Sequence, residues 1–356
     1  MATPDLTVRG AGIFGLSVAW AAARHGARVR VVDTAAVGAG ASGGIVGAMA
    51  PHVPEGWNHK KAFQLDSLLL AADWWAAVQA AGGVSPGYAR TGRLQPLADM
   101  AAVAVAQARA TGAAQLWRGA AVWRVVPAKG DGWEPASPSG WLVEDTLSAR
   151  IAPRAALAAL VAAIRARGGE VLAGVVGDTV GPVVWATGVA GLADLSRDLG
   201  RTVGGGQKGQ AALFALALPR RSLPDAPQIF ADGVHLVPHA DGTVAVGSTT
   251  ERDSDTCGTD ARLDALIARA RGLCPVLADA PVVDRWAGFR PRTIHRAPVL
   301  GEWPGRAGQY IANGGFKIGF GMAPGVAEVM ADLVLEGRDR IPADFRPETL
   351  RLRPAR

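Results

Sequence analysis

Apolar positions near the start of the chain fall into three blocks that glycines separate. Residues 6–9 predict a short buried strand, the glycine turn at 10–15 opens a predicted helix that Gly26 ends, and residues 28–33 predict a second strand. A strand, a glycine turn, a helix and another strand in this order are typical of a βαβ unit with parallel strands.

Helical periodicity is clearest at residues 153–168, where apolar side chains recur at the spacing of one helix face: Leu157, Leu160, Val161 and Ile164. An aromatic-rich helix is predicted at 61–80. Short apolar runs at 170–172 and 183–185 predict two more strands of the parallel sheet.

Between residues 210 and 286 the pattern changes to short runs in which apolar and polar residues alternate. Asp241-Gly242 lies between two such runs and indicates a hairpin turn, and a helix is predicted at 260–272. The fold class is therefore α/β (α+β overall), with a Rossmann-like domain built from separated segments and a second domain built on an antiparallel sheet.

Composition supports an ordinary globular protein. The chain has 356 residues, of which 49% are hydrophobic and 19% charged. The net charge of +6 comes mostly from scattered arginines, and the basic clusters are small (Arg220-Arg221 and residues 351–356), so nucleic acid is a secondary expectation. Cys257 and Cys274 are too few for a disulfide framework. With no apolar run of about 18 residues, we expect a cytoplasmic protein without a membrane span.

The first glycine turn carries the most specific chemistry. It reads G-x-G-x-x-G, with Gly10 permitting a tight turn, Gly12 letting the backbone approach a pyrophosphate, and Gly15 allowing the helix to pack closely on the strand. The free N–H groups at the helix start suit phosphate oxygens. Asp33, at the end of the second strand, is placed to accept hydrogen bonds from a ribose hydroxyl. These features predict a dinucleotide site.

Two further segments extend this site. Residues 38–44 are glycine-rich and lead into a second turn at 47–51, where backbone amides can approach phosphate or flavin. The strand at 183–185 runs into Ala186-Thr187-Gly188. An N-terminal glycine motif followed by a later apolar strand ending in A-T-G is typical of flavin proteins.

Two late segments make the resemblance more specific. The first is W-A-G-F-R-P-R-T at 286–293, and the second is N-G-G-F-K-I-G-F-G at 313–321. Together with the N-terminal motif, the A-T-G strand and the hairpin, these resemble the D-amino-acid oxidase (DAO) superfamily of FAD enzymes. Among its members, the chain is most similar to glycine oxidase and monomeric sarcosine oxidase.

The resemblance implies roles for individual residues. Arg290 and Lys317 correspond to positions that clamp the substrate carboxylate, as a guanidinium fork and a neighbouring ammonium can do. A helix beginning near Pro324 would point its positive end at the flavin. The residues expected to bind FAD are Gly10, Gly12, Ile13, Phe14, Gly15, Asp33, Ala41, Ser42, Gly47, Met49, Thr187, Gly188, Gly315, Phe316, Ile318 and Gly319.

Two positions depart from the family pattern. Sarcosine oxidase attaches its FAD to a cysteine that would fall near Gly288, and no cysteine follows or precedes this residue closely, so we expect non-covalent FAD. His295 stands where the family usually has an aspartate, and we interpret it as a turn residue without a catalytic role. No metal site is predicted.

The resemblance implies an FAD-binding domain at 1–50, 147–210 and 286–356 and a substrate-binding domain at 51–146 and 211–285. The implied activity is oxidation of the C–N bond of a small amino acid or secondary amine. The α-carbon gives a hydride to flavin N5, and the resulting imine is hydrolysed to an oxo acid. Two alternatives remain open: oxidation of a carboxymethylaminomethyl group in tRNA, and a quinone-linked D-amino-acid dehydrogenase. The electron acceptor is O2 or a quinone.

Overall fold

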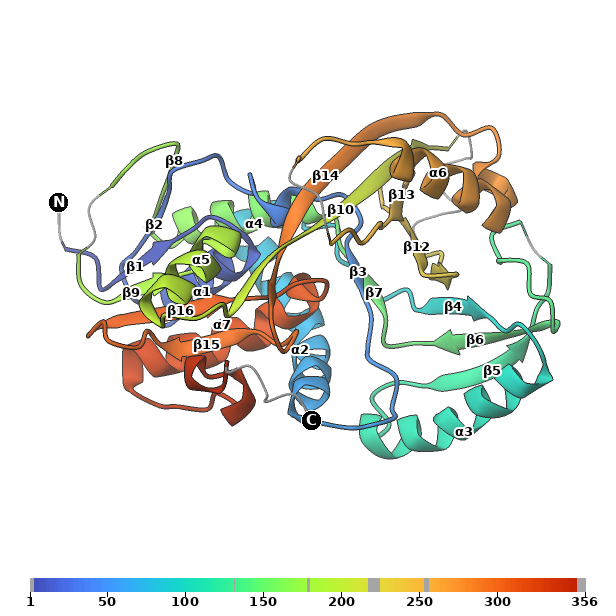
Figure 1. Ribbon diagram of the computed structural model, residues 1–356, viewed down its shortest axis with the longest axis horizontal. Helices are drawn as coiled ribbons and strands as arrows, with labels where there is room; N and C mark the ends of the chain where they lie inside the picture. The colour runs from blue at the N-terminus through green and yellow to red at the C-terminus, as the bar shows by residue number, and fades with distance from the viewer. Residues whose placement is uncertain (1–2, 131, 178–179, 217–224, 253–255, 351–356) are drawn as a thin grey trace.

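The computed structural model describes residues 3–130, 132–177, 180–216, 225–252 and 256–350. The small basic clusters at 220–221 and 351–356 therefore lie outside the described residues. Two large sheets organise the described chain, and Figure 1 shows them side by side, with the long strands β10 (Gly204–Ala215) and β14 (Val282–Thr293) extending from one half of the molecule to the other.

The first sheet contains the predicted βαβ unit. Strand β1 pairs in parallel with β2 on one side and with β9 on the other, and β2 pairs in parallel with β8, as the sequence predicted. In spatial order the six strands are β15 (Val299–Glu302), β16 (Gln309–Asn313), β9 (Val183–Trp185), β1 (Leu6–Arg9), β2 (Val29–Asp33) and β8 (Glu170–Ala173). The Rossmann-like arrangement and its assembly from separated segments are confirmed.

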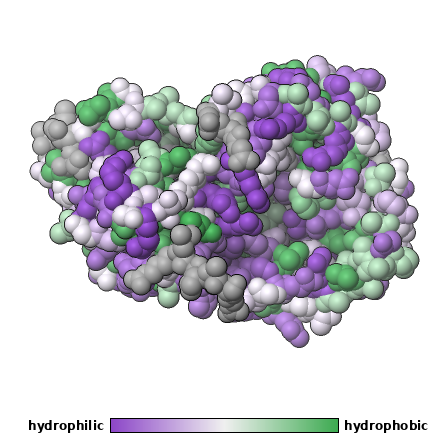
Figure 2. Space-filling view, viewed as in Figure 1, coloured by the Kyte–Doolittle hydropathy of each residue, from purple (hydrophilic) through white to green (hydrophobic). Residues whose placement is uncertain are grey.

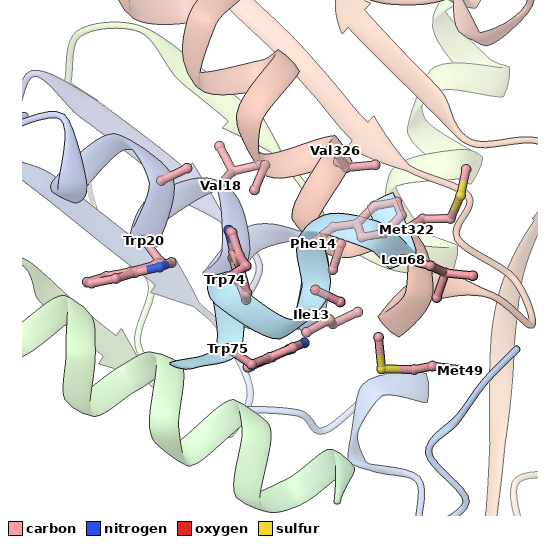
Figure 3. Packing of buried hydrophobic residues seen from close by; sticks show 14 of the residues in the cluster. Ile13, Phe14, Val18, Trp20, Met49, Leu68, Trp74, Trp75, Met322 and Val326 are labelled. Carbon is pink, nitrogen blue, oxygen red and sulfur yellow. The ribbon is translucent and has the colours of Figure 1, made fainter. Parts of the chain in front are cut away.

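Helices with apolar faces cover this sheet. Helix α1 (Ile13–Arg24) packs against α4 (Pro153–Ala166) and α7 (Gly319–Glu336), and α2 (His59–Gly82) packs against the same two helices. Figure 3 shows side chains of α1, α2 and α7 meeting in one buried cluster that includes Phe14, Trp75 and Met322. Helix α1 is buried along nearly its whole length, including its N-terminal residues.

The second sheet is mostly antiparallel and lies in the other half of the molecule (Figure 1). The predicted hairpin is present, because β12 pairs with β13 antiparallel and Gly242 has the positive φ of +89° that the turn needs. In spatial order the strands are β14, β10, β13 (Thr243–Gly247), β12 (Val234–Pro238), β11 (Gln228–Ala231), β4 (Arg93–Pro96), β6 (Trp141–Asp145) and β5 (Trp123–Pro127).

Five further elements belong to the described chain. Helices α3 (Met100–Trp117) and α6 (Ala261–Leu273) belong to the second half, and α5 (Gly188–Asp198) follows the A-T-G strand. A short antiparallel pair, β3 (Ala48–Met49) with β7 (Ala149–Arg150), lies between the halves in Figure 1. The domain boundaries predicted at 210 and 286 fall inside β10 and β14, and the division into two domains stays a prediction.

One predicted helix start is wrong. Helix α7 begins at Gly319, five residues before Pro324, and so contains this proline in its interior. Proline cannot donate the backbone bond that a helix interior requires, which is why the sequence pattern suggested a start there. The helix tolerates the proline because the next N–H, that of Gly325, donates to the buried hydroxyl of Ser67 on α2 at 3.0 Å.

Candidate active site

The glycine turn before α1 has the geometry that its spacing predicted. Gly10 has φ of +106°, and a Cβ there would lie 2.4 Å from the carbonyl oxygen of Ala186. A Cβ on Gly15 would lie 1.9 Å from the carbonyl oxygen of Gly10. Both glycines therefore allow β1, α1 and the A-T-G segment to pack closely, and their backbones shape the site from behind.

The N-terminal end of α1 faces a large cavity. Its first helical N–H, on Ile13, donates to the hydroxyl of Ser42 at 3.0 Å, and Gly12 precedes it with no side chain to obstruct an approaching group. Helix N-termini carry unpaired N–H groups and a positive dipole end. This end of the cavity is therefore suited to a pyrophosphate.

Asp33 lies at the end of β2, beside this helix start. Its carboxylate accepts hydrogen bonds from the backbone N–H of Ala11 at 2.7 Å and from that of Ala35 at 2.9 Å. These two bonds hold the carboxylate at the cavity wall, and each carboxylate oxygen has a further lone pair for a ligand hydroxyl.

The cavity has a volume of about 850 Å³ and is lined by segments from both halves of the molecule. Most of the predicted site residues line it: Gly12, Ile13, Phe14, Asp33, Ala41, Ser42, Gly47, Thr187, Gly188, Arg290, Gly315, Phe316, Lys317 and Gly319. Four predicted residues do not line it, namely Gly10, Gly15, Met49 and Ile318. The two glycines serve packing, Met49 is buried in the main core, and Ile318 packs against that core as the N-cap of α7.

Arg290 is a buried cation without an acidic partner in the described part of the chain. It is 9% exposed, and its guanidinium lies across β10, where a Cβ on Gly209 would be 1.8 Å from Nη1. Its Nη1 donates to the carbonyl oxygen of Thr249 at 3.3 Å. Burial lowers the pKa of Arg290 to about 10, against the opposing effect of Glu251, so the group remains charged at neutral pH.

The nearby carboxylate of Glu251 is occupied by other groups. It forms ion pairs with Lys208 at 3.5 Å and with Arg262 at 3.0 Å, and it accepts hydrogen bonds from Gln210 and Thr249. The guanidinium of Arg290 is therefore left to bind an anion in the cavity that it lines.

Lys317 is the second predicted cation, and the structure places it on the wall of the same cavity. Its Nζ donates to the hydroxyl of Thr250 at 2.7 Å. Desolvation lowers the pKa of Lys317, and the positive charges of Arg290 and Arg296 lower it further. Lys317 is more exposed than Arg290, so it contributes a charge nearer to the solvent.

The sequence reasoning missed His235 as a cavity residue. On β12 the side chains of Val234 and Leu236 are buried in the core of the second half, so His235 points to the opposite face and lines the cavity. Its ring lies 4.5 Å from that of Phe230, centroid to centroid, and its Nδ1 is buried without a hydrogen-bond partner among the described residues. The sequence signal for this was a polar residue, His235, between two apolar residues of a predicted strand, since alternate side chains face opposite sides of a sheet.

His235 is expected to be neutral throughout the working pH range. Burial lowers the pKa of His235 to about 3, and the charges of Arg93 and Lys317 act in the same direction. Below about pH 6.5 the histidine takes up a proton in the unfolded chain but not in the folded chain. Protonation therefore lowers the free energy of unfolding progressively as the pH drops from about 6.5 toward 3.

We expect His235→Phe to reduce the loss of unfolding free energy, measured in urea, between pH 6.5 and 4.5, by at most about 1.4 kcal/mol per pH unit. Parallel pH curves for the two proteins would contradict this.

Two other residues bear on the predictions of non-covalent FAD and of a turn role for His295. Cys257, far from Gly288 in sequence, lines the cavity, and its Sγ lies 3.6 Å from the carbonyl oxygen of Ala287. His295 lies in the turn after β14, as predicted, and its Nε2 lies 3.0 Å from the carbonyl oxygen of Thr349.

Comparison with known proteins agrees with this geometry. A sequence model of the DAO family, described as FAD dependent oxidoreductase, matches residues 5–333. A glycine oxidase of Pseudomonas aeruginosa is 36% identical over 146 residues, which is 39% of this chain and 38% of the relative. A bifunctional protein ThiO/ThiG of Nostoc sp. is 28% identical over 94% of this chain and 53% of its own length. Thus the matches cover about half or less of these relatives.

Solved structures show the same fold. The crystal structure of glycine oxidase from Geobacillus kaustophilus superposes with a TM-score of 0.80 at 22% identity, covering 96% of this chain and 98% of the other. No described helix is both long and apolar enough to cross a membrane.

Proposed function

Because the chain belongs to the DAO family of FAD-dependent oxidoreductases, we propose that it oxidises the C–N bond of a small amino acid or secondary amine. The observation that carries this proposal is Arg290, a buried guanidinium without an acidic partner among the described residues, on the wall of the cavity that begins at the N-terminus of α1. A carboxylate on the substrate would satisfy it.

The described residues fit FAD along the length of the cavity. The start of α1 and Ser42 would hold the pyrophosphate, and Asp33 would accept a ribose hydroxyl. Gly319 and Phe320, at the N-terminal end of α7, line another part of the cavity, where the helix dipole favours negative charge. When bound, FAD supplies the acceptor for two electrons and the hydrogen of the α-carbon.

The protein's part in this reaction is positioning. Arg290 and Lys317 would fix the carboxylate end of the substrate, which orients the carbon next to the amine. Loss of the nitrogen proton completes the imine, and water then splits it into an oxo acid and the released amine.

The test is anaerobic mixing of the yellow holoenzyme with glycine, sarcosine, proline and D-amino acids. Loss of the flavin absorbance near the visible maximum with at least one of them supports the proposal. No bleaching by any amine that carries a carboxylate would overturn it. Reoxidation by O2 or by a soluble quinone then identifies the class of electron acceptor.

The cytoplasm is the compartment we propose, because both cysteines are free thiols.

Asp33→Ala is expected to weaken FAD binding by about one to two decades. The change removes a charged acceptor for a ribose hydroxyl, and charge-assisted hydrogen bonds are worth roughly 1.5–3 kcal/mol. Equilibrium dialysis of the FAD-free proteins measures the dissociation constant. The KM for the amine should remain unchanged in the FAD-saturated variant. Equal FAD affinities in both proteins would show that the carboxylate serves only its backbone bonds to Ala11 and Ala35.

FAD is expected to be released into the supernatant when the protein is precipitated with acid. The cysteine to which sarcosine oxidase attaches its FAD has no counterpart near Gly288 in the sequence, but the thiol of Cys257 approaches the same segment in space. Yellow colour that stays with the precipitate of the native protein and not with that of Cys257→Ser would show a covalent bond to this residue.

A further inference from the structure

A short segment after β13 contacts both cations that we propose for the substrate carboxylate. We call it the anchor segment and define it as Thr249–Glu251. The carbonyl oxygen of Thr249 accepts from Nη1 of Arg290 at 3.3 Å, and the hydroxyl of Thr250 accepts from Nζ of Lys317 at 2.7 Å. Neighbouring residues therefore receive two cationic groups that come from β14 and from the loop before α7.

The anchor segment pairs with β10. The backbone N–H groups of Thr249 and Glu251 donate to carbonyl oxygens of this strand at 3.1 and 3.0 Å. The pairing is antiparallel, with Glu251 opposite Lys208, and this register places Thr250 opposite Gly209. The segment thus extends the second sheet at the edge of β10.

The two faces of the paired segment have different neighbours. Side chains alternate between the faces of a strand. The side chain of Thr250 is therefore on the face where the guanidinium of Arg290 lies over Gly209. The side chains of Thr249 and Glu251 point to the opposite face of the sheet, away from this guanidinium.

A buried polar network fixes the segment on that opposite face. The hydroxyl of Thr249 donates to Oε1 of Glu251 at 2.5 Å and accepts the backbone N–H of Gln210 at 2.8 Å. Glu251 is 6% exposed and forms ion pairs with Lys208 and Arg262. The position of the Thr249 carbonyl is therefore held by bonds that the hydroxyl of the same residue makes.

The two cations converge at the anchor segment. Consecutive Cα atoms lie about 3.8 Å apart, so groups that bind to neighbouring residues end close together. We propose that Thr249 and Thr250 are positioning residues, with Thr249 orienting the guanidinium of Arg290 and Thr250 the ammonium of Lys317, so that both can donate to one carboxylate. This inference rests on the proposed function, and it predicts that each threonine acts through its own cation.

Thr249→Val tests the contact with Arg290, because valine keeps the carbonyl and the shape of threonine but has no hydroxyl. The variant should bind acetate about tenfold more weakly, since misplacing a binding group by about 1 Å can cost 100-fold. The shift of the flavin spectrum on titration measures the affinity. Thr249→Ser keeps the hydroxyl and should bind acetate as wild type does.

Thr146→Val is the matched control for Thr249→Val. The hydroxyl of Thr146 also accepts a backbone N–H, that of Val122 at 2.9 Å, and the residue lies outside the cavity lining. Acetate affinity should be unchanged in this control. Equal acetate affinities in wild type and Thr249→Val would overturn the role of Thr249.

Thr250→Val tests the contact with Lys317. Both residues are exposed, and Figure 2 shows hydrophilic residues around the hollow between the two halves of the molecule. Loss of an exposed hydroxyl leaves the core intact, and acetate should bind only about threefold more weakly, because exposed polar contacts contribute little. Thr250→Ser should bind as wild type does. An unchanged acetate affinity in Thr250→Val would overturn the role of Thr250.

Double-mutant cycles separate positioning from a general loss of structure. For the amine that bleaches the flavin, Thr249→Val should lower kcat/KM about tenfold in the wild-type background and have almost no effect in the Arg290→Met background. The loss from Thr250→Val should likewise disappear in the Lys317→Met background. Equal losses in both backgrounds would show that the threonines act independently of the cations, which would overturn the inference.

Failure of the proposed function gives a different result. If no amine bleaches the flavin but the two valine variants still bind acetate more weakly than wild type, the proposed function fails and the positioning roles stand. If amines bleach the flavin and both valine variants bind acetate as wild type does, the inference fails and the proposed function stands.

Discussion

Arg290→Met is expected to weaken substrate binding by roughly 30- to 4,000-fold while FAD stays bound. The guanidinium is 9% exposed, so water can replace it only poorly as the partner of a substrate carboxylate. Truncating one partner of a buried charged pair costs about 2–5 kcal/mol, which sets the range. Steady-state kinetics and an acetate titration of the flavin spectrum measure the effect.

Lys317→Met is the matched comparison for Arg290→Met. Its ammonium is more exposed and already donates to Thr250, so its loss should raise the KM by less than the loss of the guanidinium fork. Acetate should perturb the flavin spectrum of wild type and of the Lys317 variant, and should leave that of the Arg290 variant unchanged. If both variants bind carboxylates as wild type does, a non-carboxylate amine becomes the better proposal.

Gly15→Ala is expected to yield little folded protein, and the folded fraction should lack FAD. The new methyl group would lie 1.9 Å from the carbonyl oxygen of Gly10 and 3.3 Å from Cβ of Ala186, and backbone atoms cannot yield as a flexible side chain does. Overpacking of a core costs about 1–3 kcal/mol and occasionally more, and here the displaced atoms belong to the cofactor turn itself. Thermal unfolding and the ratio of flavin to protein absorbance measure both effects.

The control for Gly15→Ala is Gly205→Ala on β10. A Cβ at Gly205 would meet no heavy atom within 4 Å, and its φ is not in the left-handed region. This variant should keep its flavin content and its unfolding temperature. A Gly15→Ala protein with the same properties would show that the α1 turn can shift without loss of the site.

The βαβ unit was predictable because its signals are local. Gly10, Gly15 and the strand ends lie close in sequence, and each residue type has one geometric reason to be there. The start of α7 was not predictable from Pro324, because the hydroxyl of Ser67, which accepts the next N–H, comes from a helix 258 residues away. When a backbone N–H donates to a side chain far away in the sequence, the residues around it carry no pattern that reveals the bond.

The same distinction applies to the site. Arg290 and Lys317 were found through a resemblance to family motifs, whereas His235 and Cys257 line the cavity because strands and loops distant in sequence converge there. The sequence gives the net charge, but only the fold shows which cationic side chains lie without an ion-pair partner.

Gly209 gives the site a mechanical property. The guanidinium of Arg290 lies flat against bare backbone at this residue, where even a methyl group would overlap Nη1. The guanidinium that we propose as the partner of the substrate carboxylate therefore depends on the absence of a side chain at Gly209 on the paired strand. An alanine at residue 209 would force the guanidinium of Arg290 to move, so the size of this residue on β10 decides where the charge of the neighbouring strand can stand.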